Sequence, residues 1–224
     1  MADESISDYD LDDGRDGDIG VYEGERNELG ERHGLGTSHF PNGDVYEGSY
    51  EHGRRNGYGI YRFKNGKYEG IYVNGKRGGR GFMHYPDGST YDGEWADNDK
   101  NGTGTYTYRN GDIYEGGWKD DQKNGKGVYT YKDSGTKLYG YWSEGVREGP
   151  AEWYNTGHSF KGYFRNDNPL GRGKFSFDSG CEQHGFYRVT NLVEQVDNRH
   201  VEVVGQETRW TCTSLTAAPP KVTL

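Results

Sequence analysis

The sequence predicts an all-β fold, an elongated, single-layer, twisted antiparallel sheet of about seven β-hairpin repeats. Two observations lead to this prediction. A segment of 22 to 24 residues recurs seven times, and within each copy aromatic residues and glycines alternate with polar residues. A fixed period of this length indicates a repeat architecture. Alternation at every second residue is typical of β-strands whose two faces differ.

Each copy predicts two strands. The first strand carries an aromatic residue, a glycine and an aromatic residue at positions one, three and five, except for Arg26 in the first copy and Leu138 in the sixth. The second strand carries glycines followed by aromatic residues at alternating positions. Seven copies therefore predict about 14 strands across residues 19–188. The seven copies open at Tyr22, Tyr46, Tyr68, Tyr91, Tyr114, Leu138 and Phe160.

The pairing of these strands follows from their turns. Asn65-Gly66 is a two-residue hairpin signal. Placed at the tip of a hairpin, it sets three pairs: Phe63 with Tyr68, Tyr61 with Gly70, and Gly59 with Tyr72. The next loop then pairs Tyr72 with Gly79 and Gly70 with Gly81. Glycine normally weakens a strand, but here an adjacent ring is expected to cover the bare backbone, so the glycines provide packing space for the rings.

The composition divides the chain into three parts. The net charge of −9 would favour disorder, but 20 tyrosines, 8 phenylalanines and 5 tryptophans give the repeats apolar area to bury. Residues 1–18 hold eight acids and one base, so the rest of the chain is close to neutral. We predict a disordered acidic tail at 1–18, the repeat array at 19–188, and an irregular or disordered extension at 189–224. The one strand-like piece of that extension is His200 to Val204.

Several classes of function find no support in the residues. Two cysteines, Cys181 and Cys212, are too few for a disulfide framework, and the acidic start is unlike a signal peptide, so the chain is interpreted as intracellular. No catalytic constellation, cofactor motif or metal-ligand cluster is recognised. The Gly-x-Gly pairs lie within strands instead of before helices, which argues against nucleotide binding. The acidic charge argues against nucleic acid. We expect no enzyme activity, cofactor, metal or small-molecule substrate.

The repeated segment, clearest from Tyr91 to Ile113, resembles the MORN repeat, whose units read YEGEW followed by Gly-x-Gly-x-Tyr. The flanks, Gly17 to Gly36 and Gly180 to Thr190, resemble the ends of such arrays in radial spoke head proteins of motile cilia. This resemblance implies a structural, non-enzymatic scaffold subunit that supports ciliary and flagellar motility through protein–protein contacts. It implies other radial spoke head subunits as partners, with a homodimer possible. It also implies a cytoplasmic, cytoskeletal location in the axoneme of a cilium or flagellum.

Two rows of side chains are candidate binding surfaces. A single-layer sheet exposes rings, and exposed rings favour protein contacts, although neighbouring residues could instead bury them within the monomer. This candidate aromatic row is Tyr50, Tyr72, Trp95, Trp118, Trp142 and Phe164. Cations before the paired glycines form a candidate basic stripe for solubility, protein docking or anionic lipid. The candidate basic stripe is Arg32, Arg55, Arg77, Lys100, Lys123 and Arg147.

Two alternative functions remain open at this stage. One is a MORN membrane-tethering module that binds anionic phosphoinositides through the candidate basic stripe. The acids that follow the leading tyrosines argue against it and against membrane contact in general. The other is an accessory array of an enzyme. The 34 residues after Thr190 are too few for a catalytic domain.

Overall fold

The structure is a computed structural model that describes residues 20–195 and 201–216, with side chains described for 20–191 and 207–216. These residues form 17 strands and no helix, so the described part of the chain offers no helix that could span a membrane. The predicted acidic tail at 1–18 and the last residues, 217–224, lie outside the described part.

The chain divides into two units, and β9 (Ile113–Lys119) contributes to both. The first unit holds Trp118–Asp121 and eight strands: β1 (Val21–Arg26), β2 (Arg32–His39), β3 (Val45–Glu51), β4 (Arg54–Phe63), β5 (Gly66–Val73), β6 (Lys76–His84), β7 (Thr90–Ala96) and β8 (Asp99–Thr107). The second holds Asn110–Gly117 and the remaining eight: β10 (Gln122–Thr130), β11 (Lys137–Ser143), β12 (Val146–Arg147), β13 (Gly149–Asn155), β14 (His158–Arg165), β15 (Asn168–Phe177), β16 (Glu182–Gln195) and β17 (Val201–Thr216).

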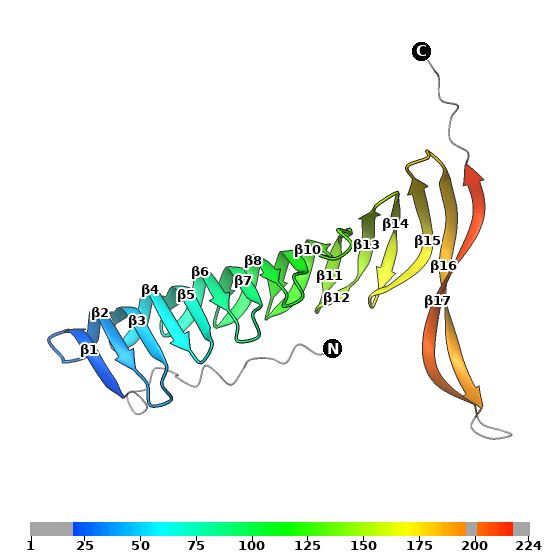
Figure 1. Ribbon diagram of the computed structural model, residues 1–224. Coiled ribbons are helices and arrows are strands. Elements are labelled where there is room, and N and C mark those ends of the chain that lie inside the picture. The colour runs from blue at the N-terminus through cyan, green and yellow to red at the C-terminus, as the bar shows by residue number, and fades with distance from the viewer. Residues whose placement is uncertain (1–19, 196–200, 217–224) are drawn as a thin grey trace, which may run out of the picture. The chain divides into compact units, whose positions relative to one another are not determined.

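Each unit is an antiparallel meander in which a strand pairs with the next one along the chain (Figure 1). In the second unit the two-residue strand β12 and the strand β13 both pair with β11. The predicted all-β antiparallel sheet of hairpin repeats is therefore confirmed. The count exceeds 14 because β12 interrupts the sixth copy and because β16 and β17 follow the seventh.

Glycines face glycines from strand to strand, and we call this row the glycine ladder. In the first unit it runs through Gly24, Gly36, Gly48, Gly59, Gly70, Gly81, Gly93 and Gly104. In the second unit Gly127 pairs with Gly140, Ala151 with Gly162, and Gly173 with Gly185. The predicted pairing of Gly70 with Gly81 is confirmed.

The register predicted for the hairpin at Asn65 is wrong by two residues. Tyr61 pairs with Tyr68 instead of Gly70, which moves every other pair of the hairpin by the same step. The cause lies in the turn. Gly66 is paired with Phe63 and covered by its ring, so the two unpaired turn residues are Lys64 and Asn65, the latter with φ of 62°.

The next predicted pair, Tyr72 with Gly79, is wrong because a bulge intervenes. Tyr72 lies opposite Arg77, and not Gly79, because the register shifts between Gly70 and Tyr72. Ile71 of β5 thus faces three residues of β6, Gly78 to Arg80, so β6 carries two extra residues at this bulge. The same shift recurs between Gly48 and Tyr50. Bulges bend the strand and increase its local twist.

The leading tyrosine of each copy folds back over the glycine ladder. The Tyr68 ring lies over Gly70 and Gly81, so closely that a Cβ on Gly81 would lie 2.6 Å from its Cζ. Its hydroxyl donates a hydrogen bond of 3.1 Å to the carbonyl of Ile71 at the bulge. The same bond from the leading hydroxyl to the carbonyl three residues on recurs in Tyr22, Tyr46, Tyr91 and Tyr114. Rings do cover glycines as predicted, but the covering ring is the leading one.

The end of the described chain differs from the predicted irregular extension at 189–224. Strand β16 continues to Gln195, and β17 covers 16 residues from Val201. The two strands pair along their whole length, from Glu182 opposite Thr216 to Gln195 opposite Val201. Since this segment lacks the repeat motif, its strand character depends on the partner strand and not on a local pattern.

Candidate functional site

The candidate aromatic row is buried within the monomer. Exposed fractions of its six side chains lie between 1% and 6%. Tyr72 lies edge-on between Tyr46 and Tyr68, with ring centroids 5.2 and 5.3 Å away. Trp95 lies in the same way between Tyr68 and Tyr91, at 5.4 and 5.2 Å. The leading rings and the row thus alternate, and we call this arrangement the aromatic ladder.

The same contact continues in the second unit. Trp142 packs edge-on against Tyr114 at 5.0 Å, and Phe164 against Phe160 at 6.4 Å. Edge-to-face pairs add about 0.5–1.5 kcal/mol each beyond the area they bury. Of the two arrangements considered for these rings, the structure shows the one in which neighbouring residues bury them within the monomer. The row is therefore part of the core of each unit.

Burial also acts on the tyrosine hydroxyls of the ladder. It raises the pKa of Tyr46, Tyr91 and Tyr114 far above the usual value for tyrosine. For Tyr91, the nearby carboxylates of Glu94, Asp121 and Asp92 raise the pKa further. The ladder is therefore built from neutral hydroxyls that donate to backbone carbonyls.

The candidate basic stripe lies among these rings. The side chains of Arg32, Arg55 and Lys100 are buried, with 5 to 7% of their surface exposed. The Arg55 guanidinium lies 5.0 Å from the Tyr72 ring centre, and its Nη2 donates a bond of 3.0 Å to the carbonyl of Gly75. Lys100 Nζ lies 5.1 Å from the Trp118 ring centre. These distances are typical of cation–π contacts.

The other three cations are half-buried and likewise lie over aromatic rings. Arg77 lies 4.6 Å from the Trp95 ring centre and donates to the carbonyl of Asn98 at 2.9 Å. Lys123 Nζ lies 5.7 Å from the ring centres of Tyr114 and Tyr129. Arg147 donates from Nε to the Asp167 carboxylate at 2.7 Å. Although burial opposes it, bonds from Arg147 hold the pKa of Asp167 below its usual value. Docking or lipid binding requires exposed cations, whereas these ones stabilise the ladder.

The exposed rings lie on the face of the strands that points away from the aromatic ladder, and we call it the opposite face. In the second unit, Tyr139, Tyr141, Tyr154 and Tyr163 are between 39 and 48% exposed. Sequence reasoning missed them, although a signal was present. The sixth copy has Tyr139 and Tyr141 at positions two and four, where the fourth copy has Asp92 and Glu94. Two large rings at solvent-facing positions of one strand are unusual for a soluble surface.

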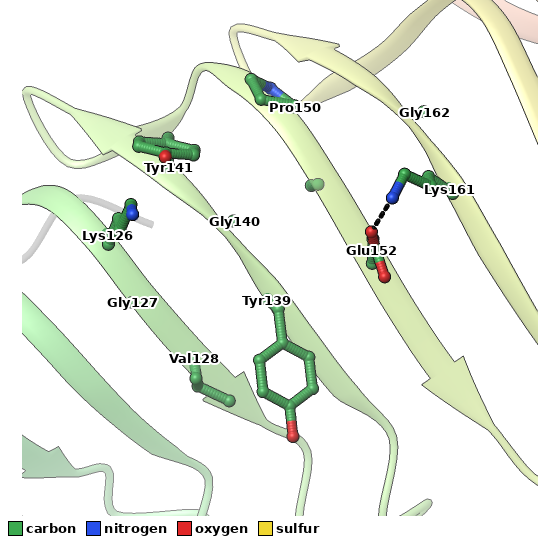
Figure 2. A pocket seen from close by; sticks show the side chains of 11 residues that line it. Lys126, Gly127, Val128, Tyr139, Gly140, Tyr141, Pro150, Glu152, Lys161 and Gly162 are labelled. Carbon is green, nitrogen blue, oxygen red and sulfur yellow. Dashed lines mark hydrogen bonds and ion pairs between the residues drawn. The ribbon is translucent and has the colours of Figure 1, made fainter.

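Two of these rings, Tyr139 and Tyr141, border a shallow groove of about 480 Å³ on the second unit (Figure 2). Its floor is the backbone of the glycine ladder at Gly127, Gly140 and Ala151. Tyr141 and Pro150 lie along one side and Val128 and Tyr139 along the other, so the groove crosses the strands (Figure 2).

Polar side chains lie at both ends of the groove. Lys161 forms an ion pair with Glu152, which also accepts a 2.7 Å hydrogen bond from the Tyr154 hydroxyl. Lys126 Nζ lies 5.7 Å from the Tyr141 ring centre. The strands beneath are already paired with each other, so a molecule seated here would be held by side chains. Aromatic walls with a few polar groups are typical of protein-contact surfaces.

Comparison with protein families identifies the class of protein to which this chain belongs. A model of the MORN repeat matches residues 28–45, 46–67, 68–90, 91–113, 114–136 and 160–182, which together cover more than half of the chain. The sixth copy, with Leu138 and Ala151 in place of the usual tyrosine and glycine, lies outside these matches. The chain is a MORN-repeat protein.

Two curated relatives narrow this class. The radial spoke head 1 homolog of Mus musculus is 55% identical over 201 residues, which cover 89% of this chain and 67% of the relative. The radial spoke head 1 homolog of Cyprinus carpio is 53% identical over 188 residues, which cover 84% of this chain and 85% of the relative. The chain belongs to the family of radial spoke head 1 homologues.

A solved structure gives a looser likeness. The SAS-4 TCP domain of Drosophila melanogaster, in complex with a proline rich motif of Ana2, matches with a TM-score of 0.36 and 18% identity. The match covers 55% of this chain and 66% of that one. A likeness of this size carries no argument about fold or binding.

Proposed function

We propose that this chain is a structural, non-enzymatic subunit of the radial spoke head in the axoneme of a motile cilium or flagellum. The observation that carries the proposal is the 55% identity over 201 residues to the mouse radial spoke head 1 homolog. The array of hairpin repeats is consistent with a scaffold. Each repeat contacts its neighbours in sequence, so an array of this kind presents an extended surface for partners.

The aromatic ladder supports the scaffold role because it ties each repeat to the next. Trp95 of the fourth repeat packs on Tyr68 of the third, and Arg77 of the third repeat bonds to Asn98 of the fourth. These contacts cross repeat boundaries within the first unit and oppose the separation of neighbouring hairpins. Such an array suits a scaffold that supports ciliary motility through protein–protein contacts.

The contact surface for partners is the opposite face, and the partners are other radial spoke head subunits. The exposed tyrosines around the groove provide apolar area with hydroxyl donors, the chemistry that is enriched at protein interfaces. This surface replaces the buried aromatic row as the candidate for protein binding.

Expression of a tagged chain in ciliated cells tests the proposal. We expect the chain to localise to the axoneme and to co-purify with radial spoke head subunits. The double variant Tyr139→Ala/Tyr154→Ala should reduce co-purification at least tenfold while its melting temperature stays close to that of the unchanged chain. Leu29→Ala, at an 80% exposed turn residue, is the matched control and should leave co-purification unchanged.

Two results would contradict the proposal at different levels. Absence of the tagged chain from the axoneme would contradict the assignment to the radial spoke head. Full co-purification of the double tyrosine variant, together with axonemal localisation, would instead contradict the opposite face as the contact surface.

A further inference from the structure

The last hairpin of the second unit has an unusual pairing pattern. Pairing between β15 and β16 ends at Tyr187, opposite Gly171. Beyond that point, Arg188–Gln195 of β16 pairs with Val201–Arg209 of β17 alone, and the hairpin runs on past β15 (Figure 1). A two-stranded hairpin is at best marginally stable in water by itself. This part of the hairpin therefore needs a further strand.

Strand β17 offers an edge for that strand. Within the described part of its unit it pairs with β16 along one edge, and no strand is paired with its other edge. The free edge spans 16 residues and contains neither proline nor lysine, two residues that protect edges against pairing. The register of β17 against β16 shifts at two places and is regular from Gly205 to Cys212. A free, regular edge of this kind is a template for strand addition.

The first unit shows how an edge is protected in this chain. Strand β1 is six residues long and holds Glu23, Glu25 and Arg26. Its register shifts between Gly24 and Arg26, where a bulge interrupts the ladder. Short length, charge and a bulge all oppose edge pairing. Strand β17 also holds charges and two register shifts, but it is 16 residues long and stays regular from Gly205 to Cys212.

We propose that β17 pairs antiparallel with β17 of a second copy of this chain, about a two-fold axis that passes through Thr208. The charge order along the strand selects this register. Glu207 and Arg209 flank Thr208, so the axis sets Glu207 of each copy opposite Arg209 of the other. Both side chains are accessible, at 42% and 73% exposed, and they form a 3.0 Å ion pair within one chain.

The register also lies within the regular part of the strand, between its two register shifts. With Thr208 at the centre, Gly205 of one copy lies opposite Thr211 of the other, so the seven positions from Gly205 to Thr211 are paired. A two-fold interface requires a surface that is complementary to itself, and the Glu-Thr-Arg order meets that requirement. The inference goes beyond the proposed function and does not depend on it.

Charge-reversal variants of the full chain test the pairing by sedimentation. We expect the unchanged chain to sediment at twice its mass of 25.3 kDa. Glu207→Arg and Arg209→Glu, each alone, set like charges opposite each other at both sites and should shift the chain to monomer. In a 1:1 mixture, a chain with Glu207→Arg has two arginines and a chain with Arg209→Glu has two glutamates at these positions. A dimer of one of each sets the arginines opposite the glutamates, so the mixture should restore the dimer.

The mixture separates pairing from folding, because neither single variant can form the ion pair within its own chain. The matched control is Arg80→Glu, which breaks the exposed Arg80–Asp92 ion pair of the first unit and should leave the dimer unchanged. A monomeric unchanged chain, or a mixture that stays monomeric like its components, would overturn the proposal. Pairing of a monomeric chain with a strand of another protein would likewise overturn self-pairing.

Discussion

Leu138 and Ala151 approach the same ladder glycine, Gly140, from two strands. A Cβ built on Gly140 would lie 3.1 Å from the Cβ of Ala151 and 3.5 Å from Cδ2 of Leu138. In the neighbouring repeat, a Cβ on Gly127 would lie 2.6 Å from the Tyr114 ring. The sixth repeat therefore fills the space of a tyrosine ring with a leucine and a methyl group, and both side chains are buried.

This relationship predicts that the two positions are energetically coupled. Leu138→Tyr alone should destabilise the chain because the Ala151 methyl occupies space that the ring needs. Adding Ala151→Gly should recover most of the loss, with a coupling energy of about 0.5–3 kcal/mol. Urea denaturation of the two single variants and the double variant measures it. Strictly additive effects would show that the two substitutions are independent.

Glycines in the ladder should not tolerate a methyl group. A Cβ on Gly70 would lie 2.5 Å from the Cα of Gly81 and 2.7 Å from the carbonyl oxygen of Arg80, so Gly70→Ala must move backbone. We expect a loss of about 1–3 kcal/mol. Gly78→Ala is the control, because its nearest neighbour is a Val73 methyl at 3.2 Å. Equal melting temperatures for the two variants would show that the ladder is not closely packed.

The hydroxyl of a leading tyrosine should stabilise the bulge beside it. Tyr91 donates to the carbonyl of Glu94 at 3.0 Å, and Tyr91→Phe leaves that acceptor without this donor. We expect a loss of about 1 kcal/mol in the free energy of unfolding. Tyr139→Phe, at a 42% exposed ring, serves as the control and should cost little. The hydrogen bond makes no net contribution if both variants unfold at the same urea concentration.

Alkaline pH should unfold the array. Burial raises the pKa of Tyr46, Tyr91 and Tyr114 in the folded chain. An unfolded tyrosine loses its proton near pH 10, so above that pH the unfolded chain binds fewer protons than the folded one. The stabilisation is therefore complete below about pH 10 and is lost as the pH rises further.

Circular dichroism and tyrosinate absorbance, recorded together during a titration, check this expectation. Strand signal should disappear as the buried tyrosines ionise, in one transition. Tyr46→Phe/Tyr91→Phe should show a shallower fall of melting temperature with pH above about 10. Ionisation of all tyrosines with the strand signal intact would contradict the role of burial.

The sequence by itself determined the class of fold and the pairing of Gly70 with Gly81. The repeat of 22 to 24 residues and the alternation within it are local patterns, and a hairpin is a local structure. The pairing of Gly70 with Gly81 followed from these patterns because it spans a single short loop. The need for rings over glycines also followed, since bare backbone within a strand has few other ways to be covered.

Only the tertiary structure decided which ring covers which glycine and where the cations lie. The two-residue error at Asn65 arose because the Phe63 ring holds Gly66 in the ladder, a contact that turn propensity does not contain. Trp95 and Arg55 were expected at a surface, yet both are buried because rings of adjacent repeats close around them. Of strand β17, only the piece from Val201 to Val204 was predicted, within the strand-like stretch His200 to Val204. The rest was missed because its pairing with β16 depends on a neighbour and not on its own residues. Burial and pairing across strands depend on several repeats at once, and no single repeat encodes them.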